Sequence, residues 1–173
     1  MERKLVLDTS IIIDGKISKM IESGEVKDCE VIIPLAALDE LQAQASMNRE
    51  PGFVGLAEIK KIRELCDGKG VTIRFVGERP SMDDIRLARH GRIDALIKDV
   101  AKQENGTLVT ADYVQSLVAE AEGIKAMHIS SPIKTTNLSF EKFLDSETMS
   151  VHLKEDVQPM AKRGKPGMFQ LVK

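Results

Sequence analysis

Four acidic side chains stand at positions where carboxylates could act together on a metal ion. Asp8 directly follows a short apolar run, and Asp112 lies just past another apolar run that ends at Thr110. Asp94 opens an expected helix, and Glu40 lies about one turn into another. Clustered carboxylates repel one another unless cations neutralise them, and their hard oxygen atoms suit Mg²⁺ or Mn²⁺. Together the four predict a site for one or two divalent ions.

Such a site suits the hydrolysis of a phosphodiester bond. Two ions roughly 4 Å apart can activate water and stabilise the leaving oxygen, so that no Lys or Cys nucleophile is needed. Each acid also has a plainer explanation, because an Asp that ends a strand is commonly a turn or cap residue. Asp94 alone could stabilise the N-terminus of its helix through the helix dipole. Glu40 alone could be a solvated helix residue. The hypothesis depends on the four lying together.

Strands and helices alternate along the chain, which places these acids in an α/β fold. We expect strands over residues 4–7, 30–33, 71–76, 107–110 and 125–129. We expect helical structure over 11–13 and then 16–21, and helices over 35–45, 52–65, 82–89, 93–104 and 114–122. This alternation predicts a three-layer α/β/α sandwich with a mostly parallel central sheet. Right-handed crossovers bring all carboxyl ends of parallel strands to one edge, where sites form in such folds. Asp8 and Asp112 should meet there.

Composition narrows the class of protein. The 173 residues fit one ordinary domain with a short appendage. Aromatic residues make up 3% and Trp is absent, which argues against a surface that stacks bases on rings. The net charge of −2 argues against a generic basic nucleic-acid binder. The charge is unevenly spread, because residues 151–173 carry a net +3 and residues 1–150 a net −5.

The two cysteines and the apolar runs indicate a cytoplasmic protein. Cys29 and Cys66 are far apart and form no CxxC pair, so that neither a disulfide framework nor a zinc site is expected. The beginning of the chain is too short and polar for a signal peptide. No apolar run approaches the roughly 20 residues of a transmembrane helix, so that we expect no membrane association.

Four segments in order resemble the PIN-domain family. They are KLVLDTS (4–10), IIPLAALDELQ (32–42), GRIDALIKDVA (91–101) and GTLVTAD (106–112). The resemblance covers roughly residues 1–130. The family includes the toxin ribonucleases of toxin–antitoxin pairs and nucleases of RNA processing and decay. Any one segment is weak evidence, whereas four in the right order are specific.

The resemblance implies a Mg²⁺- or Mn²⁺-dependent endoribonuclease. The family's four catalytic, metal-ligating acids match Asp8, Glu40, Asp94 and Asp112. Its supporting hydroxyl residues match Thr9 or Ser10 after the first acid, and Thr110 before the last. The implied substrate is RNA, with single-stranded DNA as a second candidate, and many members are homodimers. Arg79 and Arg92, near the expected site edge, are candidates for contacting substrate phosphates.

The end of the chain has a second, narrower resemblance. Residues 143–172 are similar to the junction after the PIN domain in archaeal proteins that continue into a PilT-like ATPase and a KH domain. We therefore expect a PIN-like domain over 1–132 and a basic extension or linker toward an ATPase domain over 133–173. No P-loop occurs in the sequence. The extension could be flexible, add a strand to the domain, or contact phosphates.

Three other classes of protein compare with a nuclease. Receiver domains and haloacid-type phosphatases also place Asp at strand ends, but the residues Asp8-Thr9-Ser10 match neither pattern. A non-catalytic dimerisation, RNA-binding or regulatory module of a larger PilT-like ATPase fits better. The presence of all four acids favours catalysis over this alternative.

Overall fold

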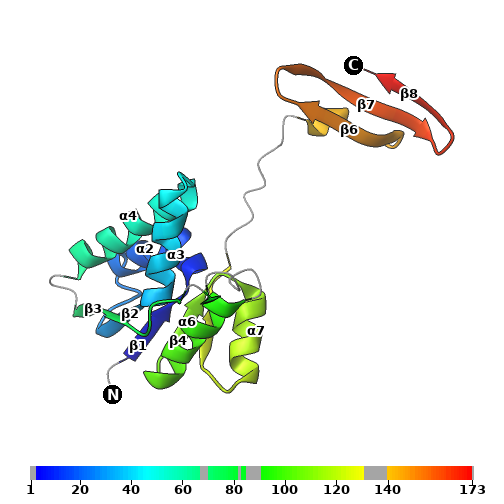
Figure 1. Ribbon diagram of the computed structural model, residues 1–173. Coiled ribbons are helices and arrows are strands. Elements are labelled where there is room, and N and C mark those ends of the chain that lie inside the picture. Colours follow the sequence, from blue (N-terminus) through cyan, green and yellow to red (C-terminus); the bar gives the residue numbers. More distant parts are fainter. Residues whose placement is uncertain (1–2, 67–69, 82, 85–90, 131–139, 173) are drawn as a thin grey trace. The chain divides into compact units, whose positions relative to one another are not determined.

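The computed structural model describes residues 3–66, 70–81, 83–84, 91–130 and 140–172. The chain forms two compact units, residues 1–131 and residues 132–173 (Figure 1). The first contains the four acids, and the second contains the basic end of the chain.

The first unit is built on a five-stranded parallel sheet. Its strands are β1 (Arg3–Leu7), β2 (Cys29–Pro34), β3 (Val71–Val76), β4 (Thr107–Thr110) and β5 (Ala126–His128). They lie in the order β3-β2-β1-β4-β5, and each neighbouring pair is parallel. β1 occupies the centre, with β2 on one side and β4 on the other.

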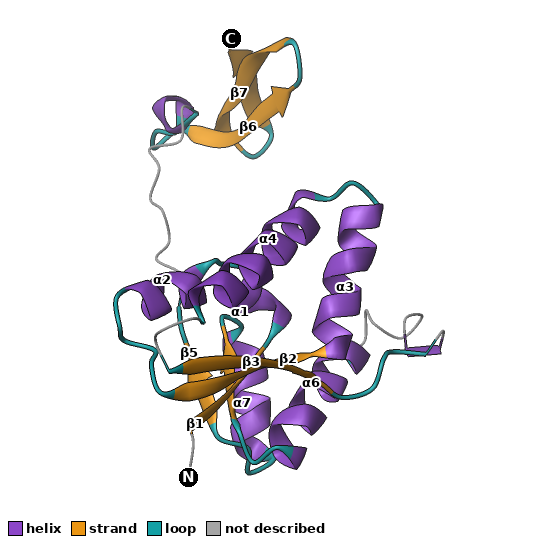
Figure 2. Ribbon diagram, turned by 90° about the vertical axis from the view of Figure 1, so that its left-hand side faces the viewer, coloured by secondary structure: helices purple, strands orange, loops and turns teal. Residues whose placement is uncertain are grey.

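Helices cover both faces of this sheet. They are α1 (Thr9–Ile13), α2 (Lys16–Glu22), α3 (Leu35–Ser46), α4 (Glu50–Leu65), α6 (Arg92–Gln103) and α7 (Tyr113–Ala121). Figure 2 shows α2 and α4 on one face and α6 and α7 on the other. The predicted three-layer α/β/α sandwich is therefore confirmed. No helix in the described part of the chain is long and apolar enough to cross a bilayer.

The three inner strands form the centre of the core. Leu5–Leu7 of β1, Val31–Ile33 of β2 and Leu108–Val109 of β4 are all buried. Near-continuous apolar runs of this kind are typical of parallel strands covered on both faces. In the outer strand β3 only Val71 is buried, Thr72 and Arg74 are exposed, and the other three residues are partly buried.

The sheet places the first and last acids at one edge. Leu7 at the end of β1 pairs with Val109 of β4, and the Asp8 backbone N–H donates to the Val109 carbonyl at 3.0 Å. The chain leaves β1 toward β2 on one side and later returns to β4 on the other. This reversal of strand order is where open α/β sheets bind their ligands, at the strands' carboxyl ends.

Two glycines fix the helix that carries Glu40. A Cβ on Gly52 of α4 would lie 2.3 Å from the backbone nitrogen of Ala45 in α3. A Cβ on Gly55 would lie 2.4 Å from Cδ2 of Leu41. Real Cβ atoms do not approach so closely, so that only glycine allows α3 and α4 this separation.

Most element boundaries fall within two residues of those expected from the sequence. The helical structure expected after β1, over 11–13 and 16–21, is found as two short helices, α1 and α2. Gly15 separates them with φ 62°, a left-handed conformation that favours glycine. The helix expected over 82–89 lies outside the described residues except for Asp83 and Asp84.

The second unit is a separate antiparallel sheet. A short 3₁₀ helix, η2 (Glu141–Phe143), precedes β6 (Thr148–Lys154), β7 (Val157–Lys165) and β8 (Met168–Val172). The strands pair in the order β6-β7-β8. The sequence predicts a flexible extension or an added strand here, whereas the structure shows two hairpins. Their turns contain Asp156 at φ 58° and Gly167 at φ 88°, which are the turn signals that the sequence reasoning missed.

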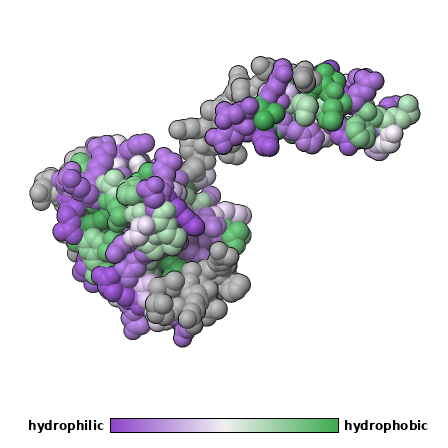
Figure 3. Space-filling view, turned by 45° about the horizontal axis from the view of Figure 1, so that its top comes forward, coloured by the Kyte–Doolittle hydropathy of each residue, from purple (hydrophilic) through white to green (hydrophobic). Residues whose placement is uncertain are grey.

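This small sheet buries few apolar side chains. Ala161, at 4% exposure, is the one buried apolar residue in the described range 140–172. The exposed large apolar residues of the unit are Leu144, Met149, Leu153, Val157, Met168, Phe169, Leu171 and Val172. Figure 3 shows apolar surface interspersed with polar surface on it. The sheet consequently has little core of its own.

Candidate metal and catalytic site

Asp8 is a buried carboxylate held by several donors. It directly follows β1, caps α1 and is only 2% exposed. Its Oδ2 accepts from the hydroxyl of Thr110 at 2.8 Å and from the hydroxyl of Ser10. The Ser10 backbone N–H also donates to Oδ2, at 3.3 Å. The two supporting hydroxyl residues predicted for this acid therefore contact it directly.

Glu40 is tied to the same segment. The hydroxyl of Thr9 donates to Oε2 of Glu40 at 2.8 Å, and Nε2 of Gln44, one turn later in α3, lies 3.4 Å from Oε1. Thr9 and Ser10 thus hold two acids from adjacent positions, because one side chain faces Glu40 and the next faces Asp8. The neighbouring Asp39 instead pairs with Arg79.

Asp112 and Asp94 complete the cluster from the side of β4 and α6. Oδ1 of Asp112 accepts from the backbone N–H groups of Val114 and Gln115, at 2.7 and 3.3 Å, and so caps α7. The Asp112 backbone N–H donates to the Thr110 hydroxyl at 3.0 Å, which links Asp112 to Asp8 through one residue. Asp94 lies exposed in the first turn of α6.

Electrostatic coupling joins all four acids. The pKa of Glu40 is raised by loss of hydration and by the negative charges of Asp8 and Asp94, although the hydrogen bond from Thr9 opposes the rise. The pKa of Asp94 is raised by loss of hydration and by Asp8 and Asp112. Asp94 remains accessible to water, which screens these effects. Asp8 contributes to both shifts, and Asp94 is the acid coupled to each of the other three.

These residues fit a hydrated divalent cation. The donor set consists of carboxylate oxygens alone, the ligands preferred by Mg²⁺ and Mn²⁺. Among the residues that the structure describes, no three acidic, His or Cys side chains converge as a ready ligand cage. Mg²⁺ usually keeps several waters and takes one or two carboxylates. The arrangement is therefore an open carboxylate cluster that can hold an ion partly through water.

Comparison with known proteins identifies the family. The model of the PIN domain matches residues 5–121, more than half of the chain. The chain belongs to the PIN-domain family. PIN domains are generally nucleases and typically depend on divalent metal, so that the open carboxylate cluster lies in a nuclease-type fold. The first unit is called the PIN unit from here on.

The PIN unit and the end of the chain both match curated relatives. A KH and PIN-domain containing protein of Methanocaldococcus jannaschii is 44% identical over 170 residues, 98% of this chain and 26% of the relative. The Holliday junction branch migration ATPase PINA of Sulfolobus acidocaldarius is 31% identical over 98% of this chain and 31% of its own length. The chain therefore spans about a quarter to a third of the length of these two relatives.

A solved structure supports the same fold. A domain of a functionally unknown protein from Methanocaldococcus jannaschii superposes with a TM-score of 0.71 and 40% sequence identity. The match covers 79% of this chain and 97% of that one. The family and the fold predicted from the sequence are thus both shown.

The two predicted phosphate-binding arginines of the PIN unit each pair with a nearby acid. Arg79 pairs with Asp39, and Nε of Arg92 lies 2.6 Å from Oδ1 of Asp84. Neither pair includes one of the four acids. The nearly buried Lys98, one turn after Asp94, opposes the rise in the pKa of Asp94. Substrate contact by Arg79 and Arg92 stays a prediction.

Gln115 is a site residue of the PIN unit that sequence reasoning missed. It is 7% exposed, and its side-chain amide lies beside Asp8 and Thr110. The signal was present in the sequence. Gln115 follows the helix cap Asp112 by three residues and lies on the side of α7 that also buries Ser116 and Ala119. A polar residue on a buried helix face needs a partner, and the nearest candidates are the polar groups after β1 and β4.

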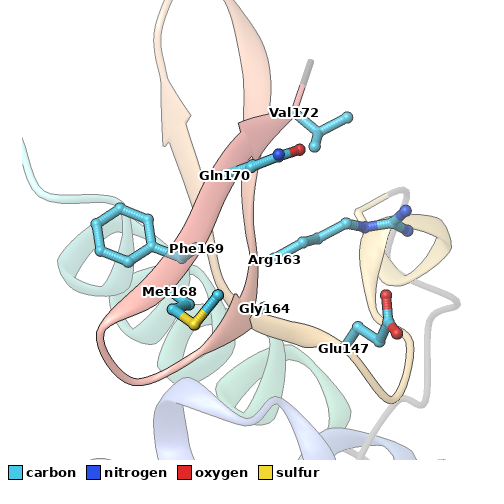
Figure 4. A pocket seen from close by; sticks show the side chains of 7 residues that line it. All are labelled: Glu147, Arg163, Gly164, Met168, Phe169, Gln170 and Val172. Atoms are coloured by element: carbon cyan, nitrogen blue, oxygen red, sulfur yellow. The ribbon is translucent and has the colours of Figure 1, made fainter.

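The second unit has a pocket whose lining residues are all different from those of the acidic cluster. It is lined by Glu147, Arg163, Gly164, Met168, Phe169, Gln170 and Val172. Figure 4 shows Phe169 on one side of β8, with Gln170 and Val172 on the other. The guanidinium of Arg163 pairs with Asp145. The lining contains none of the four acids, so that the pocket does not belong to the candidate metal site.

Proposed function

We propose that the PIN unit is a metal-dependent endoribonuclease that uses Asp8, Glu40, Asp94 and Asp112. The observation that carries this proposal is the gathering of the four acids around the carboxyl ends of β1 and β4. Hydrogen bonds through Thr9 and Thr110 tie Glu40, Asp8 and Asp112 to this edge. The negative charges of the neighbouring acids help to raise the pKa values of Glu40 and Asp94. A cluster that repels itself when metal-free is suited to bind cations. Its all-oxygen chemistry favours Mg²⁺ or Mn²⁺.

The chain's own residues would hold and orient the reacting groups. The four acids bind one or two ions, directly or through water, and Thr9, Ser10 and Thr110 fix the orientation of Asp8 and Glu40. A bound cation supplies Lewis-acid stabilisation of charge on the phosphate and lowers the pKa of water. In the overall hydrolysis a water oxygen bonds to phosphorus and the bond from phosphorus to the 3′-oxygen breaks. One water proton passes to that oxygen, which leaves 3′-hydroxyl and 5′-phosphate ends.

RNA is the proposed substrate, with DNA as the competing one. The relative from Methanocaldococcus jannaschii combines a PIN domain with a KH domain, and KH domains are a common single-strand RNA-binding module. The relative from Sulfolobus acidocaldarius is a Holliday junction ATPase, whose substrate is branched DNA. A direct comparison of RNA and DNA substrates therefore distinguishes the two possibilities.

The test is cleavage of a labelled, mixed-sequence single-stranded RNA with and without Mn²⁺. Single-stranded DNA and a four-way DNA junction are assayed in parallel. Asp8→Asn and Asp94→Asn should each reduce metal-dependent cleavage by about 100-fold or more, because metal catalysis is worth several kcal/mol. Asp99→Asn is the matched control, since Asp99 is an exposed acid on the same helix as Asp94. Equal cleavage by wild type and Asp8→Asn would refute the assignment.

A second candidate function follows from the length of the relatives. The chain spans 26% and 31% of two multidomain relatives, one of them an ATPase. The PIN unit could then serve as a regulatory, dimerising or nucleic-acid-binding module, with the second unit as the connection to an ATPase domain. Mn²⁺ binding without cleavage of any substrate would favour this function. Sedimentation of the chain, with and without the acid substitutions, tests the proposed homodimer.

A further inference from the structure

The side chain of Gln115 lies beside Asp8 and comes from a different helix than Ser10, another donor to the same carboxylate. Ser10 reaches Asp8 from α1, whereas Gln115 reaches it from α7. Its side chain is buried, so that the hydrogen bonds it makes are not replaced by bulk water. Which of its two amide atoms faces Asp8 decides what it does there.

The hydrogen-bond pattern selects the amide nitrogen. If Oε1 of Gln115 faced the site, it would lie against the carboxylate of Asp8, acceptor against acceptor. It would also compete with Asp8 for the single hydroxyl proton of Thr110. With Nε2 facing the site, the amide lies 2.7 Å from Oδ2 of Asp8, 3.2 Å from Oδ1 and 3.1 Å from the Thr110 oxygen, and donates to each. Only the second orientation satisfies every group.

The donors are unequally divided between the two oxygens of Asp8. Oδ2 receives the Ser10 hydroxyl, the Ser10 backbone N–H, the Thr110 hydroxyl and the short bond from Gln115. Within the described residues, Oδ1 receives only the longer contact from Gln115. A carboxylate has about four lone-pair sites over both oxygens. Oδ2 is therefore saturated by the protein, and Oδ1 keeps its capacity to bind.

We infer that Gln115 is a positioning residue that, with Ser10 and Thr110, saturates Oδ2 of Asp8 and leaves Oδ1 as the single metal-ligating oxygen. This inference rests on the metal site of the proposed function. Gln115 acts through Asp8, and nothing requires it to touch the ion or the substrate. Partners that orient a ligand in this way commonly contribute 10- to 100-fold in metal affinity.

The same residue also orients the acid after β4. The backbone N–H of Gln115 donates to Oδ1 of Asp112, alongside that of Val114. Oδ1 of Asp112 thus accepts the hydrogen bonds that cap α7. In the same way, Oδ2 of Asp8 accepts the hydrogen bonds from the hydroxyl groups of Ser10 and Thr110. Gln115 consequently fixes both strand-end acids relative to each other, through its side chain on one and its backbone on the other.

The experiment compares Mn²⁺ binding by calorimetry for the full 173-residue wild type, Gln115→Leu and the control Gln103→Leu. Gln103 is an exposed glutamine at the end of α6. We expect Gln115→Leu to bind Mn²⁺ about 10-fold more weakly, whereas Gln103→Leu binds as the wild type does. A thermal melt and a circular dichroism spectrum show that each variant is folded. Wild-type affinity in folded Gln115→Leu, or no Mn²⁺ binding by the wild type, overturns the inference.

A second readout does not need metal and covers the case in which Gln115→Leu fails to fold. The side-chain NH₂ signal of Gln115 is assigned by NMR in the metal-free wild type. Asp8→Ala removes its acceptor and should move that signal toward the position of an exposed glutamine such as Gln103. An unmoved signal overturns the proposed hydrogen bond. Because neither readout uses cleavage, wild type that binds Mn²⁺ and cuts nothing refutes the nuclease proposal while leaving the role of Gln115 standing.

Discussion

The hydroxyl groups next to Asp8 and Glu40 offset only part of the unfavourable free energy that arises when the acids repel one another and lose hydration. The bond from Thr9 lowers the pKa of Glu40, yet loss of hydration and the charges of Asp8 and Asp94 raise it more. The same holds for Asp94, where Lys98 opposes the larger effects. The metal-free protein is therefore less stable at neutral pH than it would be without these charges, and cation binding relieves this repulsion.

Glu40→Gln should consequently stabilise the metal-free protein at neutral pH. A carboxyl group whose folded-state pKa is raised stabilises the fold fully below its unfolded pKa, 4.5 for Glu40, and loses this contribution as pH rises through the folded pKa. The free energy of unfolding of the wild type should thus fall relative to that of Glu40→Gln as pH rises from about 4 to 8. The difference should reach at most about 1 kcal/mol, because solvent screens part of the interaction.

The measurement is urea unfolding in EDTA across this pH range. Glu120→Gln is the control, since Glu120 is an exposed acid on α7 and should show no comparable trend. A stability difference between Glu40→Gln and wild type that stays constant with pH would contradict the coupling.

At the scale of the elements, the closest helix contact positions one acid. Gly52 of α4 lies against the backbone of α3 near Ala45, and Gly55 lies against Leu41, the residue after Glu40. Side chains at these two positions would push the helices apart. The position of Glu40 thus depends on two glycines that have no chemical role.

Gly52→Ala should therefore destabilise the PIN unit by about 1–3 kcal/mol, the usual cost of overpacking, despite the better helix propensity of Ala. The blocking atom at 2.3 Å is backbone, which cannot swing away as a side chain can. Chemical denaturation measures the loss. Ala57→Ser adds an atom on the exposed face of α4 and should change stability by less than about 0.5 kcal/mol. A similar loss of stability in Gly52→Ala and Ala57→Ser would show that α3 and α4 can move apart without a large change in free energy.

The elements that local sequence decides were the ones that could be predicted. β1, β2 and β4 are short apolar runs that end abruptly, and the polar residue directly after β1 is Asp8. Tertiary packing decides the rest. The side chain of Gln115 lies beside Asp8, a residue more than a hundred positions earlier in the chain. No local pattern encodes which amide atom faces a carboxylate.

At the scale of the whole molecule, the two units differ in how they are stabilised. The PIN unit has a contiguous apolar core, whereas the second unit buries Ala161 alone among its described apolar residues. A small sheet without a core is marginal in water. The free energy of local opening should therefore differ strongly between the units.

Amide hydrogen exchange should reveal this difference. Amides of β1 and β4 should exchange only through global unfolding, and those of β6, β7 and β8 should exchange at least about 100-fold faster. Truncation after Ser131 should leave the melting temperature of the PIN unit within about 2 °C, because the core residues all precede that point. Protection in β7 equal to that in β1 would show that the second unit is stabilised by contacts beyond its own sheet.

The central position of β1 in the sheet also determines when the acidic site can assemble during synthesis of the chain. β1 is synthesised before the other four strands of its sheet, but its partner β4 starts at Thr107, so that their pairing closes a loop of about a hundred residues. At usual rates of translation, roughly 5–20 s separate the synthesis of Asp8 from that of Asp112. During that interval β1 has β2 alone beside it, and Asp8 lacks both Thr110 and Gln115. The acidic centre is thus completed late in the folding of the PIN unit, and a nascent chain that ends before β4 has no complete centre.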